Sequence, residues 1–465
     1  MPERRAAGLC IAALAAPLTA CRSEPPLPAD PTGIQARPSF VLLLPDSLRA
    51  DRLDATRDGV PVAPAMQSLV ARGVRFDRAF SQAGWTMPAL AAVLTGRYPV
   101  VPRADPSQLA WRAPGARGLA ESLAAEGYHT VGFFGPNADA LRAEYTESFS
   151  EEGQGGTAAL ARWLAVGPPE PFLAVVHDVD LQFVSHAEDL AQIPGAAADI
   201  TALRRPREQD AAALSIGEVV RILAPVLGPQ AAAARVQADY DAAVTAWDRD
   251  LAAVLAALEA TGLAARTVVV LTSPHGHHLG EHQRFVHGTL HEPDLHVPLV
   301  WADGSFPGGG RRDPDEVLLL DLAPTLLARV QAPPDPASDG RSLLGLLQLG
   351  SPGWEPRHSF ALNNRRDMAL RAWPAKLVRF EPGRKDPGAP PVGHLCFDLQ
   401  EDPGEDRPDP EACGPALGEE LTAFHAARIA QSDAQAPGAD NPALVRKLRE
   451  QGYWDQLAPE GEPGR

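Results

Sequence analysis

Short apolar runs without polar alternation recur along the first 350 residues, and segments of helical periodicity separate them. Strands buried on both faces have this pattern, and such strands occur in parallel sheets that helices cover on both sides. The clearest helical segment spans residues 235–262, and a shorter one spans residues 118–126. The alternation predicts an α/β fold with a largely parallel central sheet sandwiched between helices. The runs expected to form strands are Phe40–Leu44, Thr130–Phe134, Phe172–Val176, Val268–Leu271 and Val297–Trp301.

The pattern changes after about residue 350. Short candidate strands are joined there by turns rich in Pro and Gly, and two candidate helices follow. We therefore expect the α/β domain to occupy residues 38–350 and a small C-terminal antiparallel subdomain with terminal helices to occupy residues 351–465. The strands are expected at residues 359–362, 377–379 and 395–399, and the helices near residues 416–431 and 442–451.

The first 38 residues have the layout of an export signal followed by a tether. Two arginines precede an apolar stretch over residues 6–20, which is too short to span a bilayer comfortably. The stretch ends in Leu-Thr-Ala-Cys, which resembles the lipid-attachment signal of bacterial lipoproteins. Residues 1–21 are therefore expected to be a lipoprotein signal peptide with lipidation at Cys21, and an ordinary signal peptide is the alternative. Residues 22–38, with five prolines, are expected to form an extended tether.

Charge and cysteine usage fit an exported protein. The net charge of −17 argues against an extended basic surface, so no nucleic-acid partner is expected. We expect the protein at the bacterial cell envelope, with membrane contact through the lipid anchor only, and Arg22 favours the outer membrane. Apart from Cys10 and Cys21, only Cys396 and Cys413 remain. In an oxidising compartment this pair is expected to form a disulfide, and two free buried thiols are the alternative.

Residues that directly follow the apolar runs are candidates for a functional site, because ligands of such sheets bind beyond the carboxyl ends of strands. Asp46 follows the first run, where its carboxylate would meet a cation or cap a helix. Ser273-Pro274-His275-Gly276 follows the fourth run, and seven of the 13 histidines lie between His275 and His296. Clustered imidazoles at a strand end indicate a metal site or a polar loop over the sheet.

A motif between residues 86 and 99 narrows the function. Thr86-Met87-Pro88-Ala89-Leu90 is followed by Thr95-Gly96-Arg97-Tyr98-Pro99. This stretch resembles the sulfatase family, within the alkaline phosphatase superfamily. A nucleophile in that family begins a Cys/Ser/Thr-x-Pro pattern, and a helix of small residues then ends in Thr-Gly-x-Tyr-Pro. The opening VLLLPDSLRADRLD resembles the family's first metal-binding strand, and further segments match in the same order as far as residue 453.

The resemblance implies hydrolysis or transfer of sulfate or phosphate esters, with one divalent metal that assists the nucleophile. Thr86 stands at the nucleophile position. Sulfatases proper convert a Cys or Ser at this position into formylglycine, so no formylglycine is expected here. A threonine hydroxyl attacks directly in the superfamily's phosphoryl-group transferases. The alternative role of Thr86 is a helix cap close to Pro88.

The resemblance fails at several functional positions. Leu90 stands where sulfatases proper have an arginine four residues after the nucleophile. Asp180-Leu181-Gln182 replaces an Asp-Pro-His pattern that supplies a catalytic histidine. A serine follows Asp46 where many members have a second aspartate. Pro274 precedes His275, although the family pattern Ser-Asp-His-Gly provides an aspartate and a histidine that both hold the metal.

The resemblance and the departures together define a reduced metal site. Asp46 and His275 are the expected metal ligands, and His287 is a catalytic candidate because sulfatases often have an active-site Lys or His at its position. One carboxylate, one imidazole and the Thr86 hydroxyl suit Zn²⁺ better than Ca²⁺, which prefers several oxygen ligands, but both metals stay under consideration. His277, His278 and His287 are candidates for a fourth ligand, and His287 is the best of them. The remaining histidines are expected to form a polar loop.

Three functions are compatible with this sequence. The first is a sulfatase-like hydrolase that acts on a sulfate or phosphate ester through a metal-assisted nucleophile. The second is a Thr-dependent phosphoryl-group transferase. The third is a catalytically degenerate sulfatase-fold protein that binds such an ester at the cell envelope. Residues 182–232 match no motif and are expected to select the ester.

Overall fold

The chain divides into two units, residues 1–36 and residues 37–465. In the computed structural model, all residues whose placement is described lie in the second unit. The expected signal peptide, lipidation at Cys21 and helix near residues 442–451 lie outside the described residues. No helix within the described ranges is both long and apolar enough to cross a membrane. The described residues are 37–100, 115–135, 148–179, 181, 183–186, 213–285, 287–304, 309–350, 354–363, 367–380 and 393–434.

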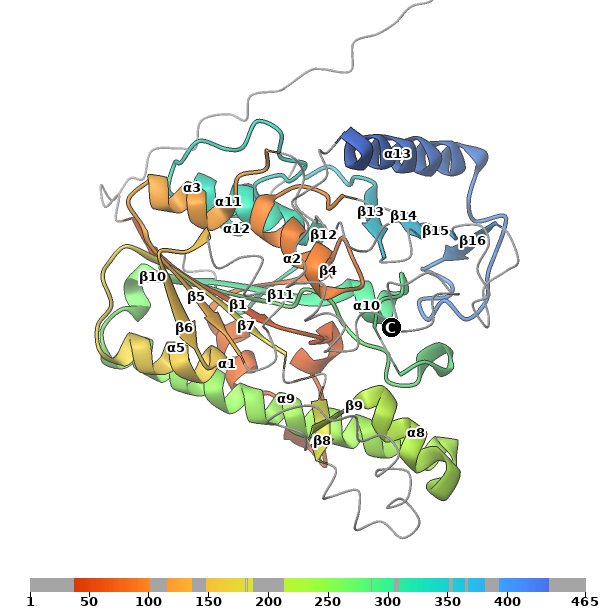
Figure 1. Ribbon diagram of the computed structural model, residues 1–465, viewed down its shortest axis with the longest axis horizontal. Coiled ribbons are helices and arrows are strands. Elements are labelled where there is room, and N and C mark those ends of the chain that lie inside the picture. The colour runs from red at the N-terminus through yellow and green to blue at the C-terminus, as the bar shows by residue number, and fades with distance from the viewer. Residues whose placement is uncertain are drawn as a thin grey trace, which may run out of the picture. The chain divides into compact units, whose positions relative to one another are not determined.

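The centre of this unit is one eight-stranded sheet (Figure 1). Its strands are β1 (Ser39–Pro45), β4 (Val74–Phe80), β5 (His129–Phe134), β6 (Glu151–Gln154), β7 (Phe172–Asp178), β10 (Thr267–Thr272), β11 (His296–Asp303) and β12 (Arg311–Leu318). The order across the sheet is β12-β4-β11-β10-β1-β7-β5-β6. β11 runs antiparallel to β10 and β4, and the other neighbouring pairs are parallel. The predicted α/β fold with a largely parallel sheet is therefore confirmed.

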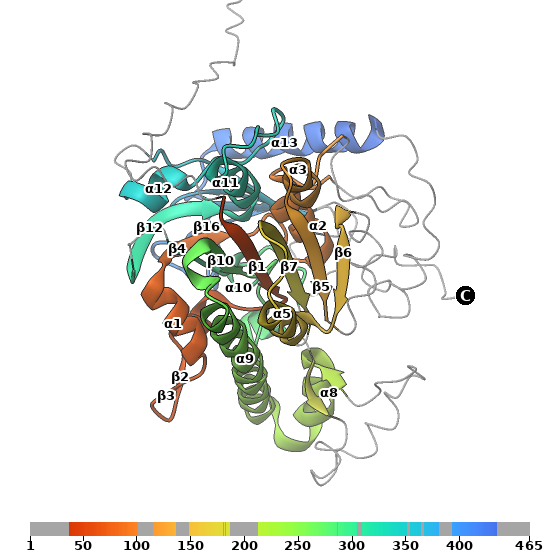
Figure 2. The ribbon, with the colours of Figure 1, turned by 90° about the vertical axis from the view of Figure 1, so that its left-hand side faces the viewer.

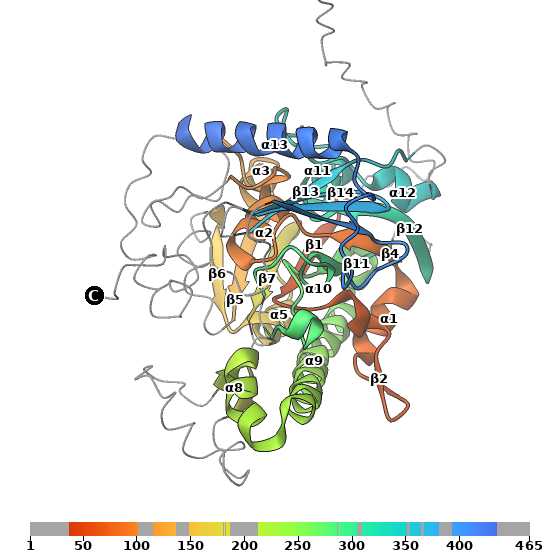
Figure 3. The same cartoon turned by 90° about the vertical axis from the view of Figure 1, so that its right-hand side faces the viewer.

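Helices cover both faces of the sheet (Figures 2 and 3). Along β1, Phe40 and Leu42 pack in one apolar cluster, and Val41 and Leu43 pack in another. This alternation places a separate hydrophobic core on each face, as the helix-covered sheet predicts. The first cluster includes residues of α2 (Thr86–Thr95), α3 (Leu119–Ala125), α11 (Leu322–Arg329) and α12 (Leu344–Leu349). The second includes residues of α1 (Pro64–Arg72), α5 (Gly156–Ala165), α8 (Ile216–Leu227) and α9 (Pro229–Ala260).

All five predicted strands of the central sheet are present, whereas β4, β6 and β12 were not predicted. β4 carries charged residues, and tertiary partners pair them. Arg75, only 8% exposed, lies 2.7 Å from Asp54, and Arg78 lies 2.8 Å from Glu316 on β12. The sequence of β4 is partly polar, so its periodicity does not predict a buried strand. Ion pairs with residues distant in sequence offset the free-energy cost of burying its charged side chains. The predicted helix at residues 235–262 is α9, which begins earlier, at Pro229.

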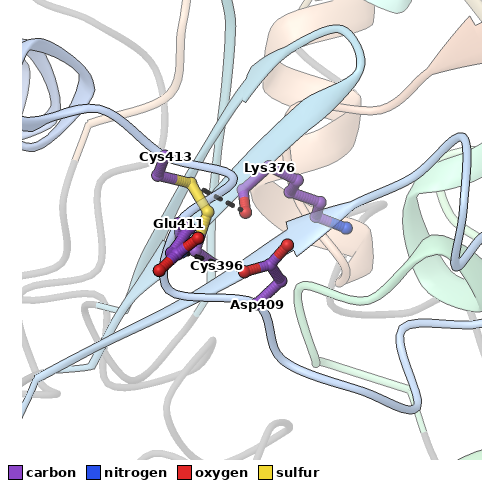
Figure 4. The surroundings of a disulfide bond; sticks show 5 residues. All are labelled: Lys376, Cys396, Asp409, Glu411 and Cys413. Atoms are coloured by element: carbon purple, nitrogen blue, oxygen red, sulfur yellow. Dashed lines mark hydrogen bonds between the residues drawn. A yellow bond between two sulfur atoms is a disulfide. The ribbon is translucent and has the colours of Figure 1, made fainter.

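A small antiparallel sheet follows, as predicted for the C-terminal part. It consists of β13 (Ser359–Leu362), β14 (Met368–Ala372), β15 (Ala375–Arg379) and β16 (His394–Asp398), and α13 (Pro415–Ala434) comes after it. β14 was not predicted. Cys396 of β16 is disulfide-bonded to Cys413, whose sulfur lies 3.6 Å from the Lys376 carbonyl oxygen (Figure 4). Two small hairpins, β2 (Thr56–Arg57) with β3 (Val60–Pro61) and β8 (Phe183–His186) with β9 (Ala213–Ser215), complete the strands described.

A buried ion cluster joins the small sheet to the main domain. Lys376 on β15 is 1% exposed, and its amine lies 2.6 Å from Glu405 and 2.9 Å from Glu292. Glu292 also lies 2.7 Å from Arg371, which in turn lies 3.1 Å from Glu316 on β12. The charges alternate along this chain of contacts, so each buried ion has an opposite charge beside it.

Candidate active site

Three polar side chains meet at the carboxyl edge of the central sheet. Asp46 follows β1, Thr86 begins α2 and His275 follows β10, and all three are buried. The Thr86 hydroxyl oxygen lies 3.0 Å from Asp46 Oδ2 and 3.0 Å from His275 Nε2. His275 Nε2 also lies 3.0 Å from Asp46 Oδ1. The fold thus brings the expected nucleophile and the two expected metal ligands into direct mutual contact.

Hydrogen bonds between the two strand-end loops hold Asp46 and His275 in place. The residue after Asp46, Ser47, has a positive φ of 64°, which re-aims the chain sharply as it leaves β1. The Tyr240 hydroxyl on α9 donates to the Ser47 carbonyl oxygen at 2.7 Å. Ser273 Oγ accepts from the Leu48 amide at 3.0 Å and donates to the His275 carbonyl oxygen at 2.6 Å. One serine side chain therefore joins the loop after β1 to the loop after β10.

A close backbone approach places His287 beside the start of α2. A methyl group at Gly84, two residues before Thr86, would lie 2.0 Å from the Thr289 carbonyl oxygen. The Gly288 amide donates to the Gly84 carbonyl oxygen at 2.7 Å. Only glycine permits these two backbones to come so close. The loop that carries His287 is therefore fixed against the segment that leads into the nucleophile.

A short helix, α10 (Glu292–Leu295), supports the loop that carries His275. The Gly276 amide donates to the Asp294 carbonyl oxygen at 2.8 Å, and the Asp294 carboxylate accepts from the Thr289 amide at 2.7 Å. Glu405 accepts from the amide of the first residue of α10 at 2.7 Å. Since Glu405 belongs to the buried ion cluster, the C-terminal part of the chain contacts the segment that supports the site.

Two further imidazoles lie next to this trio. The His287 ring stacks on the His275 ring with centroids 4.6 Å apart, and its buried Nε2 has no hydrogen bond among the described residues. His177, on β7, places Nε2 3.8 Å from Asp46 Oδ2. Sequence reasoning missed His177 because an apolar run leads directly into it. The available signal was the presence of a histidine at the carboxyl end of a strand that is otherwise fully apolar.

The other clustered histidines bond elsewhere. His277 Nδ1 lies 2.7 Å from the His278 carbonyl oxygen, and this contact occupies the ring nitrogen nearest the backbone. His278 Nε2 lies 2.9 Å from the Thr289 hydroxyl. His282 and His291 have ring centroids 4.2 Å apart. Most of the histidine cluster therefore shapes the loop between β10 and β11.

The positions where the family pattern fails are partly described. Leu90 is 2% exposed and packs in the apolar core between the sheet and α2, so its side chain belongs to the core. Leu181 is likewise buried, in the core on the other face. Asp180 and Gln182 lie outside the described residues.

The charges of the central pair stabilise each other. Burial alone would raise the pKa of Asp46, but the adjacent His275 imidazole above all holds that pKa below its ordinary value. Burial alone would lower the pKa of His275, but Asp46 more than offsets it and the pKa of His275 is raised. Burial lowers the pKa values of His177 and His287, and it lowers the pKa of His277 to about 4. The site thus combines one charge-stabilised carboxylate–imidazole pair with neutral imidazoles.

These side chains do not complete a metal site. Within the described ranges, no three or more His, Cys, Asp and Glu side chains are grouped so that they could hold a metal ion. Catalytic zinc sites have three protein ligands, and calcium prefers six to eight oxygens. Asp46 and His275 supply two ligands, and Ser47 and Pro274 stand where the family pattern has further carboxylates. The chemistry of the site therefore has to follow from the side chains that the structure brings together.

Known proteins resemble this chain in sequence and in fold. Arylsulfatase K of Gallus gallus is 31% identical over 186 residues, which cover 37% of this chain and 33% of that protein, so the match spans about a third of the relative's length. The phosphonate monoester hydrolase of Agrobacterium radiobacter superposes with a TM-score of 0.59 at 19% identity and covers 84% of this chain and 96% of its own. A protein solved in complex with its substrate D-glucosamine-2-N,6-O-disulfate superposes with a TM-score of 0.59 at 16% identity. The match covers 87% of this chain and 100% of that protein's chain.

The two structural likenesses show a shared fold, because their sequence identities are low. The assignment of the family comes from the sequence itself. The sequence model of the family described as Sulfatase matches residues 38–332, from the start of the central sheet to the end of α11. This range exceeds half of the 465 residues and contains Asp46, Thr86 and His275. The chain therefore belongs to the sulfatase family.

Proposed function

We propose that this protein hydrolyses sulfate or phosphate esters with Thr86 as the nucleophile. The supporting observation is the position of the Thr86 hydroxyl, 3.0 Å from both Asp46 and His275 in a buried site. Thr86 is also the first residue of α2. The amides and the dipole at a helix N-terminus favour an anion, which suits the charged ester that the hydroxyl would attack.

Asp46 is oriented to accept the proton of the nucleophile, because the Thr86 hydroxyl donates to its Oδ2 at 3.0 Å. His275 Nδ1 lies 2.7 Å from the Gly276 carbonyl oxygen, which can only accept, so Nδ1 carries a hydrogen. His275 Nε2 lies 3.0 Å from Asp46 Oδ1, so it carries the second hydrogen of the imidazolium. As the Thr86 oxygen bonds to sulfur or phosphorus, Asp46 takes the hydroxyl proton, and the His275 imidazolium holds the carboxyl group in place.

The reaction is then completed in three further proton transfers. The bond between sulfur or phosphorus and the leaving oxygen breaks, and the leaving oxygen takes the proton back from Asp46. A water molecule next attacks the sulfated or phosphorylated Thr86 and gives a proton to the same carboxylate. That proton returns to the Thr86 oxygen when inorganic sulfate or phosphate departs. Leu90 adds no positive charge to offset the ester, so we expect a slow enzyme.

Aryl sulfate and aryl phosphate assays test this proposal, with Thr86→Ala as the critical variant and Thr86→Ser as the conservative one. Thr95→Ala is a matched control, because Thr95 lies on the same helix and its hydroxyl donates to the Ala91 carbonyl oxygen. We expect Thr86→Ala to lose about a thousandfold or more in kcat, Thr86→Ser to keep measurable turnover and Thr95→Ala to stay near wild type. Equal turnover by Thr86→Ala and wild type would rule out Thr86 as the nucleophile.

A binding protein is the second candidate function. Leu90 in the core and Pro274 at a ligand position favour it, because both remove groups that the family pattern uses for catalysis. Calorimetric binding of inorganic sulfate or phosphate without turnover of either aryl ester would support this alternative. Transfer of the group to an added alcohol, in place of water, would instead identify a phosphoryl-group transferase.

The expected metal and the expected location remain predictions. Metal analysis of the purified protein tests for one divalent ion, zinc or calcium. Lipidation at Cys21 is tested in a bacterial host by comparing the full chain with Cys21→Ser. We propose that the full chain is recovered in the membrane fraction with lipid attached and that the variant is not. Recovery of both in the soluble fraction would contradict an envelope anchor.

A further inference from the structure

His177 has an unusual position among the buried polar groups. It lies on β7 near the centre of the sheet, with Leu44 of β1 and Phe134 of β5 as its neighbours across the ladders. Its side chain is 2% exposed. β7 ends at the same edge of the sheet as β1, so the imidazole lies beside the residue that follows β1, Asp46.

Neither ring nitrogen of His177 has a hydrogen bond within the described part of the chain. A neutral imidazole has one donor and one acceptor, and buried groups of this kind normally have partners. His275, His277 and His278 each make at least one such bond. Among the described histidines, only His177 has both nitrogens buried and unpaired.

The neighbouring carboxylate on β7 does not serve His177. Asp178 accepts hydrogen bonds from the Thr157 amide and hydroxyl and from the Trp247 indole nitrogen. The Asp46 carboxylate lies beside His177, with its Oδ2 3.8 Å from Nε2, beyond hydrogen-bond distance. The same Oδ2 atom lies 3.0 Å from the Thr86 hydroxyl. His177 and Thr86 therefore border one carboxylate oxygen.

We propose that His177 binds the ester directly, and that a ring N–H donates a hydrogen bond to an oxygen of the sulfate or phosphate group held at Thr86. This inference rests on the proposed function and adds a residue to it. An oxygen-rich anion supplies the acceptor that the described protein groups do not supply. A hydrogen-bond donor on β7 would also replace part of the stabilisation of the anionic ester that an arginine at the position of Leu90 would provide.

Replacing His177 by phenylalanine tests the inference, since phenylalanine keeps a ring and removes both nitrogens. His177→Gln keeps a side-chain donor. His129→Phe is the control. His129 begins β5, at the amino ends of the strands and away from the site, and pairs there with Glu151. The measurements are kcat/KM for an aryl sulfate, calorimetric binding of inorganic sulfate and phosphate, and the melting temperature.

We expect His177→Phe to weaken anion binding and to lower kcat/KM by roughly 10- to 100-fold, the range for a hydrogen bond to a charged group. His177→Gln should retain part of both. The melting temperature of His177→Phe should stay level or rise, because the change removes two unpaired buried polar atoms. A purely structural role for the imidazole predicts the opposite, a lower melting temperature with unchanged anion binding.

The possible outcomes separate this inference from the proposed function. Thr86-dependent turnover with unchanged kcat/KM and anion binding in His177→Phe overturns the inference and leaves the hydrolase intact. Anion binding that is lost in His177→Phe, in a protein without turnover, supports the inference and overturns the hydrolase. A wild-type protein that binds neither anion overturns the inference as well.

Discussion

Replacing Lys376 by methionine would break the ion cluster that joins the small sheet to the site. The Lys376 amine contacts Glu405 at 2.6 Å and Glu292 at 2.9 Å, and the Glu405 side chain is completely buried. Burial alone would raise the pKa of Glu405, but Lys376 holds that pKa below its ordinary value, so Glu405 is ionised at pH 7. The variant leaves this carboxylate in the interior without its closest positive charge.

The loss of stability in Lys376→Met depends on which acidic partner is left without a positive charge beside it. Removing one member of a buried ion pair costs about 3–5 kcal/mol, mostly because the other charge stays buried and unpaired. Glu292 keeps Arg371 at 2.7 Å, so Glu405 alone accounts for the loss. Glu405 retains the amide of Glu292 at 2.7 Å and His291 at 3.2 Å. We therefore expect Lys376→Met to lower the free energy of unfolding by about 3 kcal/mol, the lower end of the range. This is a large part of the total, because native proteins usually unfold at a cost of about 5–15 kcal/mol.

Urea unfolding at pH 7, followed by tryptophan fluorescence and far-UV circular dichroism, measures this loss. Lys376→Met combined with Glu405→Gln removes both charges, and the double variant should recover most of the loss. Arg72→Met is the control, since Arg72 and Glu259 form an exposed pair at 2.6 Å that is worth less than about 1 kcal/mol. A Lys376→Met protein as stable as Arg72→Met, or a double variant no more stable than the single one, would refute the reasoning.

Three further predictions concern pH, metal and oxidation. Burial lowers the pKa of His277 from 6.5 to about 4, so its neutral form stabilises the folded state fully above pH 6.5. This contribution to the free energy of unfolding falls by up to about 3 kcal/mol as the pH drops to 4. In urea unfolding across this range, the stability of His277→Gln should fall less than that of wild type, and an equal fall would show that His277 is not the titrating group. Pro274→Asp restores a carboxylate beside His275 and should bind more zinc or calcium per protein than wild type in metal analysis; an equal metal content in both would show that Pro274 does not limit metal binding. Cys396→Ser and Cys413→Ser should each lower the unfolding free energy by about 3 kcal/mol, since the bond closes a loop of sequence separation 17, and reductant should have no further effect on either variant.

The family resemblance could be recognised without a structure because each of its motifs consists of residues that are close together in the sequence. Thr86, Pro88 and the Thr95–Pro99 segment lie within 14 residues, and Asp46 directly follows an apolar run. Such motifs can be read from the order of residue types alone. His177 lacked this kind of signal, because its importance depends on a contact with Asp46, which is remote in sequence.

The sequence by itself determined the strands β1, β5, β7, β10 and β11, the long helix α9 and the identity of Asp46, Thr86 and His275 as site candidates. Hydrophobic periodicity reports local burial, and this is enough to predict such elements. The tertiary structure alone decided that charged β4 is an inner strand of the eight-stranded sheet, that Lys376 pairs with Glu405, and that His177 lies beside Asp46. The physical reason is that ion pairs and hydrogen bonds between distant residues depend on distances in space, and neither composition nor periodicity encodes those distances.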